Sequence, residues 1–62
     1  MAMKKAEAEE LARQLEGWED VELRWDPEVP EEWGQYYIVA WEPRSKRWTI
    51  WDSPSQDYAR FI

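Results

Sequence analysis

Tryptophan content is the feature that most constrains this chain. A chain of 62 residues buries only about 60% of the surface that it exposes when unfolded, so its core has to be dense. The sequence has six tryptophans and no cysteine, so aromatic burial must take the place of disulfide bonds. The composition therefore predicts a single small domain over residues 1–62, with most tryptophans in its core. Residues 1–3 have the form of a cloning remnant without function.

The first segment has helical periodicity. Apolar side chains recur at spacings of three and four residues from residue 8 onward, namely Ala8, Leu11, Ala12, Leu15 and Trp18. This spacing places them on one stripe of a helix. Glu9 and Arg13 lie one turn apart, and Gly17 stands where a glycine commonly follows a helix end. The pattern predicts a helix over residues 4–16.

Three later segments have strand patterns. Residues 21–25 alternate apolar and charged side chains, which predicts a half-buried strand with Val21, Leu23 and Trp25 facing inward. Residues 36–41 are apolar on both faces, which is typical of a central strand, and residues 47–51 form the third strand. Between the first two lies a long loop, residues 26–34, with two prolines and four acids.

The turn between the last two strands predicts their register. Pro43 suits the second position of a type I turn in a four-residue loop, so Glu42 should face Arg47 across the hairpin. One face of the sheet then carries Tyr37, Val39, Trp41, Trp48 and Ile50, and the other carries Tyr36, Ile38, Ala40, Thr49 and Trp51. We expect the helices to cover the face with Tyr37, Val39, Trp41, Trp48 and Ile50.

The end of the chain has a capping-box pattern from Ser53 to Gln56 with Pro54 at the first helical position. It predicts a short helix over residues 54–61, with Tyr58, Phe61 and Ile62 inward. The alternative is a 3₁₀ turn that leads into a closing strand over residues 59–62.

The expected fold class is therefore α+β, in the order α-β-β-β-α. A three-stranded antiparallel sheet is packed on one face by the N-terminal helix and the short C-terminal helix. Double-stranded-RNA-binding domains share this order of elements, but they depend on basic residues at the second helix, where this chain has only Arg60.

Charge and composition exclude several function classes. The net charge of −6 comes from residues 16–32, where eight acids stand against Arg24 alone, so we expect no direct nucleic-acid partner. No segment is long and apolar enough to span a bilayer, so we expect no membrane partner and a cytoplasmic location. Without histidine or cysteine, the usual nucleophile and metal constellations are absent. The chain is predicted not to be an enzyme and to need no cofactor.

Carboxylates are the remaining candidates for site chemistry. The pairs Glu19-Asp20 and Glu31-Glu32 would need a buried, pKa-raising site for acid–base catalysis, and so small a domain has little interior for one. The acids at positions 26, 28, 31 and 32 match no calcium-loop spacing. We expect neither catalytic residues nor a metal site.

Aromatic side chains offer the remaining binding chemistry. If the face opposite the helices is uncovered, it exposes an apolar aromatic patch, and such patches mark interaction sites. The predicted binding residues are Trp33, Tyr36, Ile38 and Trp51. The alternative is that Trp33 and the acidic loop fold over this face as a second small core.

Three short segments carry a tryptophan, a tyrosine pair, and a second tryptophan followed by a proline, namely Gly17-Trp18-Glu19, residues 34–38 and Trp51 to Pro54. In this order they resemble the sequence pattern of WW domains. The resemblance implies a three-stranded sheet that binds proline-rich peptides, with Tyr36 and Trp51 in the groove and Trp18, Tyr37 and Pro54 supporting it. It covers about half of the chain, and two of its spacings are longer than that family tolerates.

Three functions fit these observations. The first is a protein- or peptide-interaction module, with proline-rich peptides among its partners, that is a monomer or weak dimer. The second is an acidic inhibitor or decoy protein of a mobile element that docks residues 16–32 on a basic surface. The third is a de novo designed mini-protein without biological function, which the capping box and the absence of Cys and His would suit.

Overall fold

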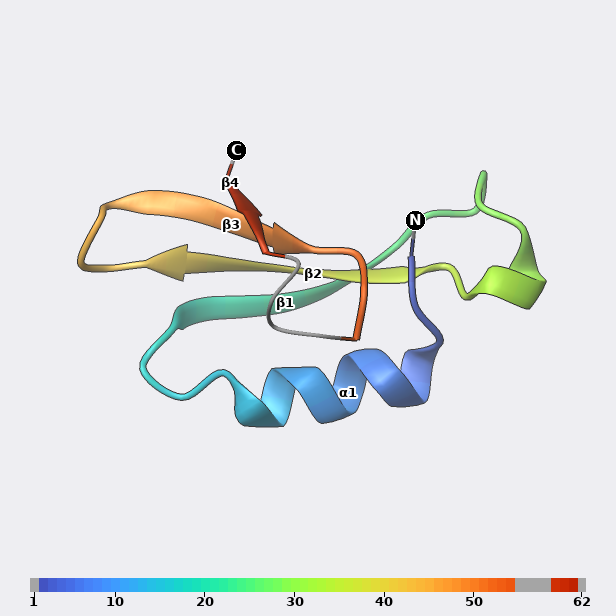
Figure 1. The fold of residues 1–62 in the computed structure, drawn as a ribbon, viewed down its shortest axis with the longest axis horizontal. Coiled ribbons are helices and arrows are strands. Elements are labelled where there is room, and N and C mark those ends of the chain that lie inside the picture. Colours follow the sequence, from blue (N-terminus) through green and yellow to red (C-terminus); the bar gives the residue numbers. More distant parts are fainter. Residues whose placement is uncertain (1, 55–58, 62) are drawn as a thin grey trace.

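A computed structural model describes residues 2–54 and 59–61 of the chain. Its elements are α1 (Lys5–Gln14), β1 (Glu19–Trp25), the 3₁₀ turn η1 (Glu31–Trp33), β2 (Tyr36–Glu42), β3 (Arg47–Trp51) and β4 (Arg60–Phe61). The strands form one antiparallel sheet in the order β1-β2-β3-β4. Helix α1 runs along one side of this sheet (Figure 1). The α+β class is confirmed, with four strands in place of the three predicted.

The predicted helical stripe forms the inner side of α1. Ala8, Leu11 and Leu15 are buried, and Ala12 and Trp18 pack against the same core. The helix begins one residue later and ends two residues earlier than predicted. At its start the Lys4 backbone N–H donates to Glu7 Oε1 at 3.0 Å, which satisfies a donor near the helix end.

The predicted register between β2 and β3 is confirmed, and the predicted helix position is wrong. Glu42 lies opposite Arg47, and Trp41 opposite Trp48. Yet the core beneath α1 contains Ile38, Ala40, Thr49 and Trp51. We call the face with Tyr36, Ile38, Ala40, Thr49 and Trp51 the helix-covered face, and the face with Tyr37, Val39, Trp41, Trp48 and Ile50 the open face.

Side-chain size explains why α1 packs where it does. Ala40 and Thr49 are opposite each other at the middle of the hairpin, and both are fully buried together with Ala8 of α1. Small side chains at this point let the helix backbone approach the sheet. The bulky Trp41–Trp48 pair in the corresponding place on the open face would hold a helix farther away, because close packing leaves no room for overlap.

Strand β1 is at the edge of the sheet, and this position overturns part of its prediction. Leu23 lies opposite Ile38 and Trp25 opposite Tyr36, so both side chains are on the helix-covered side as expected. Nevertheless Leu23 is 38% and Trp25 59% exposed, because an edge strand has a neighbouring strand on one side only. Only Val21 packs against the core.

The C-terminal helix prediction is wrong where the structure describes it. Arg60 and Phe61 form a short strand opposite Ile50 and Thr49, as the alternative of a closing strand anticipated. Phe61 is exposed, and the Arg47 guanidinium carbon lies 3.4 Å from its ring centroid. Residues 55–58 and 62, which include Tyr58, Ile62 and the capping-box Gln56, lie outside the described residues.

The N-terminal segment belongs to the fold. Met3 is buried in the core and pairs with Tyr36 through two backbone hydrogen bonds of 2.7 and 2.8 Å. Gly34 makes this approach possible, because its φ is +85° and a Cβ there would lie 2.2 Å from the Met3 carbonyl carbon. Met3, which the sequence assigned to a remnant, therefore ties the start of α1 to the start of β2.

Candidate interaction surface

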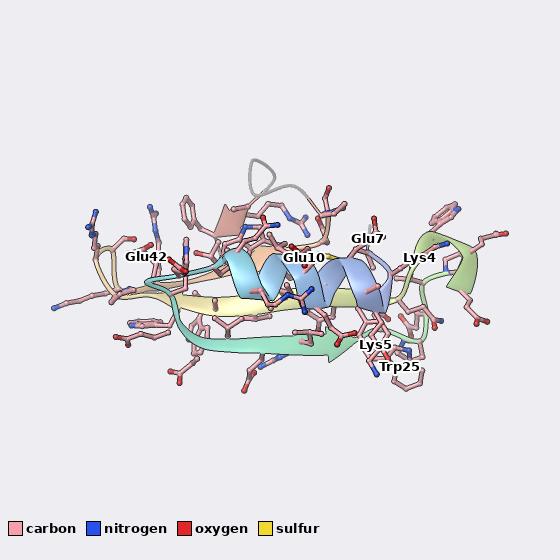
Figure 2. The ribbon with its side chains drawn as sticks, turned by 90° about the horizontal axis from the view of Figure 1, so that it is seen from below. Lys4, Lys5, Glu7, Glu10, Trp25 and Glu42 are labelled. Carbon is pink, nitrogen blue, oxygen red and sulfur yellow. The ribbon has the colours of Figure 1, made fainter. Side chains whose placement is uncertain are left out.

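The open face is the strongest candidate for a functional surface. Its five side chains come from the alternate positions of β2 and β3 that point away from α1. Among residues 2–54 and 59–61, no helix packs on it. Figure 2, which looks at the molecule from the side of α1, shows the helix lying along the sheet, with Glu42 near one end and Lys4 and Trp25 near the other.

Two tryptophans dominate the open face. The Trp41 and Trp48 rings meet edge to face, with centroids 5.5 Å apart and planes at 67°, an arrangement that aromatic pairs favour. Trp48 is 37% exposed, and Trp41, Tyr37 and Ile50 are partly exposed around it. Val39 is buried among them. An aromatic surface with a buried aliphatic floor is thus presented to solvent.

This surface is concave. A cleft of about 300 Å³ is lined by Arg24, Tyr37, Val39, Trp48 and Ile50. A second cleft of about 250 Å³ is lined by Ala2, Asp26, Val29, Tyr37, Ile50, Asp52 and Arg60. Because Tyr37 and Ile50 line both clefts, the two clefts adjoin, and we refer to them together as the groove of the open face.

Two ion pairs flank the groove. On the β1 side, Arg24 Nη2 lies 3.0 Å from Glu22 Oε2. The Glu22 carboxylate, and after it the Tyr37 hydroxyl, raise the pKa of Arg24 above its ordinary value. On the β4 side, Arg60 pairs with Asp52. The groove is therefore apolar along its floor and carries both signs of charge at its rims.

The predicted binding residues are not on this surface. Ile38 and Trp51 are 0% and 1% exposed beneath α1, and Tyr36 is partly buried and packs against the same core. Trp33 is 57% exposed in η1. The structure thus brings Tyr36, Ile38 and Trp51 together, but in the core. The prediction that they form an open patch is wrong, as is the alternative that Trp33 covers them.

The packing of Trp51 also bears on the WW-domain resemblance. Trp18 and Trp51 contact each other edge to face, with ring centroids 4.7 Å apart and planes at 83°. The resemblance implies that these two tryptophans stand on opposite sides of the sheet, one supporting it and one lining the groove. They share a single core instead, so the residue roles implied by that resemblance do not apply.

Trp41 and Trp48 were expected in the core, but they are the main residues of the open face. One signal in the sequence could have found them. The predicted register already placed Ala40 opposite Thr49, and this is the one cross-strand pair of small side chains between the two strands. A helix packs most closely over such a pair, which leaves the tryptophans on the other face.

Within the described ranges 2–54 and 59–61, no group of three His, Cys, Asp or Glu side chains could hold a metal ion. No described helix has the length and apolar character needed to cross a membrane. Comparisons with protein-family models, curated proteins and solved structures find no match to this chain.

Proposed function

We propose that the chain is a non-enzymatic interaction module that binds a peptide in the groove of its open face. The observation that carries this proposal is the uncovered Trp41–Trp48 pair beside a concave apolar floor. The two contacting, partly exposed rings form an apolar patch, and exposed apolar patches mark interaction sites. Tryptophan and tyrosine are also the residues most enriched at binding hot spots.

The groove favours a proline-rich peptide. The middle of the sheet has no free backbone edge, so a ligand there must bind through side chains and not by adding a strand. A polyproline helix suits such a site because it is already extended and its carbonyl groups project outward. Proline rings would stack on Trp48 and Tyr37, while the Arg24 guanidinium would donate to peptide carbonyls. The net charge of −6 favours basic residues on either side of the prolines.

The experiment is a fluorescence titration with a panel of proline-rich peptides that carry flanking arginines. Trp48→Ala should weaken binding about tenfold or more, because it removes the most exposed ring of the groove. Trp33→Ala is the matched control, since Trp33 is exposed but lies outside the groove, and it should leave the affinity unchanged. Equal effects of the two substitutions, or no binding by any peptide, would refute the proposal.

The acidic segment favours docking on a basic surface as a second candidate. Seven of the eight carboxylates in residues 16–32 are exposed, Asp26 being the partly buried one. Binding through this segment alone would fall steeply with added salt, whereas binding in the aromatic groove would fall less, because the stacking of rings on Trp48 and Tyr37 does not depend on salt. Salt titration of any complex therefore distinguishes the two functions. That the chain is a designed protein, or not an enzyme, stays a prediction.

A further inference from the structure

The outer edge of β1 carries unpaired backbone groups. This strand is the first in the sheet order and has β2 as its only partner strand among the described residues. The Asp26 N–H donates to the Gln35 carbonyl at 2.7 Å, so the Asp26 position faces β2. Because backbone groups alternate along an antiparallel strand, those of Arg24 also face β2, and those of Leu23 and Trp25 point outward.

The side chains of this edge are exposed as well. Leu23 and Trp25 are on the helix-covered side but remain exposed, while Glu22 and Arg24 are on the side of the open face. Natural edge strands are usually protected by charges, prolines or bulges. Here a register shift lies between Glu19 and Glu22, so the regular pairing of β1 with β2 covers only Glu22 to Trp25.

We propose that a second copy of this chain pairs with β1 in antiparallel fashion, about a twofold axis at Leu23. The stretch Val-Glu-Leu-Arg-Trp is self-complementary in this register. Glu22 falls opposite Arg24 of the second copy and Arg24 opposite its Glu22, which gives two pairs of opposite charge on one face. Leu23 falls opposite Leu23, and Val21 opposite Trp25, which buries apolar side chains on the other face.

This pairing does not depend on peptide binding, and it would change what the protein presents. An axis perpendicular to the sheet places both α1 helices on one side of a continuous eight-stranded sheet and both open faces on the other. The exposed Leu23 and Trp25 side chains would fill the space between the two helices. Two grooves on one surface would also bind a repetitive ligand with higher avidity than a single groove.

Charge limits the strength of the dimer. Each copy carries a net charge of −6, and the acids that flank the paired stretch, Asp20 and Asp26, would approach those of the second copy at both ends. Both repulsions are screened by salt. The dimer is therefore expected to be weak at low salt and to strengthen as salt is added. An association driven by the Glu22–Arg24 pairs alone would instead weaken as salt is added.

The test is sedimentation equilibrium of the full chain from micromolar to millimolar concentration, in a charge-reversal cycle. Glu22→Arg or Arg24→Glu alone sets like charges opposite each other twice and should raise the dimer Kd about tenfold. The double variant restores opposite charges across the interface and should recover dimerisation. A double variant as weak as the single ones, with unchanged circular dichroism, would overturn the proposal.

Amide exchange tests the same register at the backbone. The N–H groups of Leu23 and Trp25 should exchange more slowly as the concentration rises, while that of Arg24 should be protected at every concentration because it faces β2. Leu23→Lys should abolish dimerisation, and Trp48→Lys on the open face should not. A chain that stays monomeric at millimolar concentration in high salt, or a dimer sensitive to Trp48→Lys and insensitive to Leu23→Lys, would contradict the proposal.

Discussion

The helix-covered face and the open face are built from the same two strands, β2 and β3, yet they differ in side-chain size and in exposure. The helix-covered face holds two small residues at its middle, Ala40 and Thr49. Both side chains are fully buried, as is that of Ile38 beside them. The open face holds Trp41 and Trp48, which are larger and remain partly exposed. Apolar character is similar on the two faces, so shape decides which face receives the helix.

The comparison separates two uses of tryptophan. Trp51 is fully buried and contacts Trp18, so its area contributes to folding. Trp48 contacts Trp41 in a similar edge-to-face geometry, but water reaches it. Burial of a large ring stabilises in proportion to the area removed from water, so substitutions on the two faces should have unequal costs.

The largest expected effect is that of Trp51→Ala. Removing this buried ring should destabilise the fold by about 3–5 kcal/mol, because the transfer free energy is lost and a cavity remains. Trp48→Ala is the matched substitution on the open face and should cost about 1 kcal/mol. Urea unfolding followed by circular dichroism measures both, with Trp51→Phe as a milder variant. Equal losses would mean that the two faces do not differ as described.

Gly34→Ala should have the next largest effect. A Cβ at this position would collide with the Met3 backbone and would be strained by the positive φ, so the Met3–Tyr36 pairing that leads α1 onto the helix-covered face would be broken. The expected cost is about 3 kcal/mol. Gly17→Ala is the control, since Gly17 has the same sign of φ but open space around it, and it should cost about 1 kcal/mol. Thermal unfolding of the two variants gives the comparison.

Ala40→Leu tests whether side-chain size positions the helix. Added methylenes beneath α1 should cost about 2 kcal/mol, because the buried site has no spare volume. Val39→Leu makes a smaller addition at the neighbouring position on the open face and should cost less than about 1 kcal/mol, since Val39 lines a cleft into which the added volume can extend. If the Val39 substitution is the more harmful in denaturant unfolding, the account of helix placement fails.

The smallest effect concerns the outer surface of α1. Hydrogen bonds from Arg13 and Gln14 lower the pKa of Glu10 below its ordinary value, so this contribution to stability is present above the unfolded-state pKa and is lost as the pH falls through the folded-state pKa. The pair is exposed and screened. Glu10→Gln should therefore leave the melting temperature unchanged at neutral pH, and any slight difference from the parent should vanish in acid.

Local rules were enough to predict much of this fold from sequence. The stripe from Ala8 to Trp18 predicted the helix and its buried side, because a helical period reports directly on one face. The turn at Pro43 predicted the hairpin register, because a turn fixes which residues are opposite, and the register in turn divided the side chains between two faces. These predictions involve neighbours in the sequence or across a single turn.

The remaining predictions failed where contacts depend on distant segments. Alternation divides β2 and β3 into two faces but does not say which face α1 covers, so Tyr36, Ile38 and Trp51 were assigned to the surface and Trp41 and Trp48 to the core. Likewise, nothing local in residues 21–25 shows that β1 is an edge strand, so Trp25 was expected to be inward. The inward assignment of Phe61 failed because β4 pairs with β3 at the margin of the sheet.

The open face as the binding surface is the central claim, and the six indole N–H signals in a two-dimensional NMR spectrum test it most directly. During titration with an arginine-flanked proline-rich peptide, the signals of Trp41 and Trp48 should shift, while those of Trp18 and Trp51 should not, because they lie on the other side of the sheet. Shifts confined to Trp25 or Trp33, or shifts of Trp51 ahead of Trp48, would contradict the account.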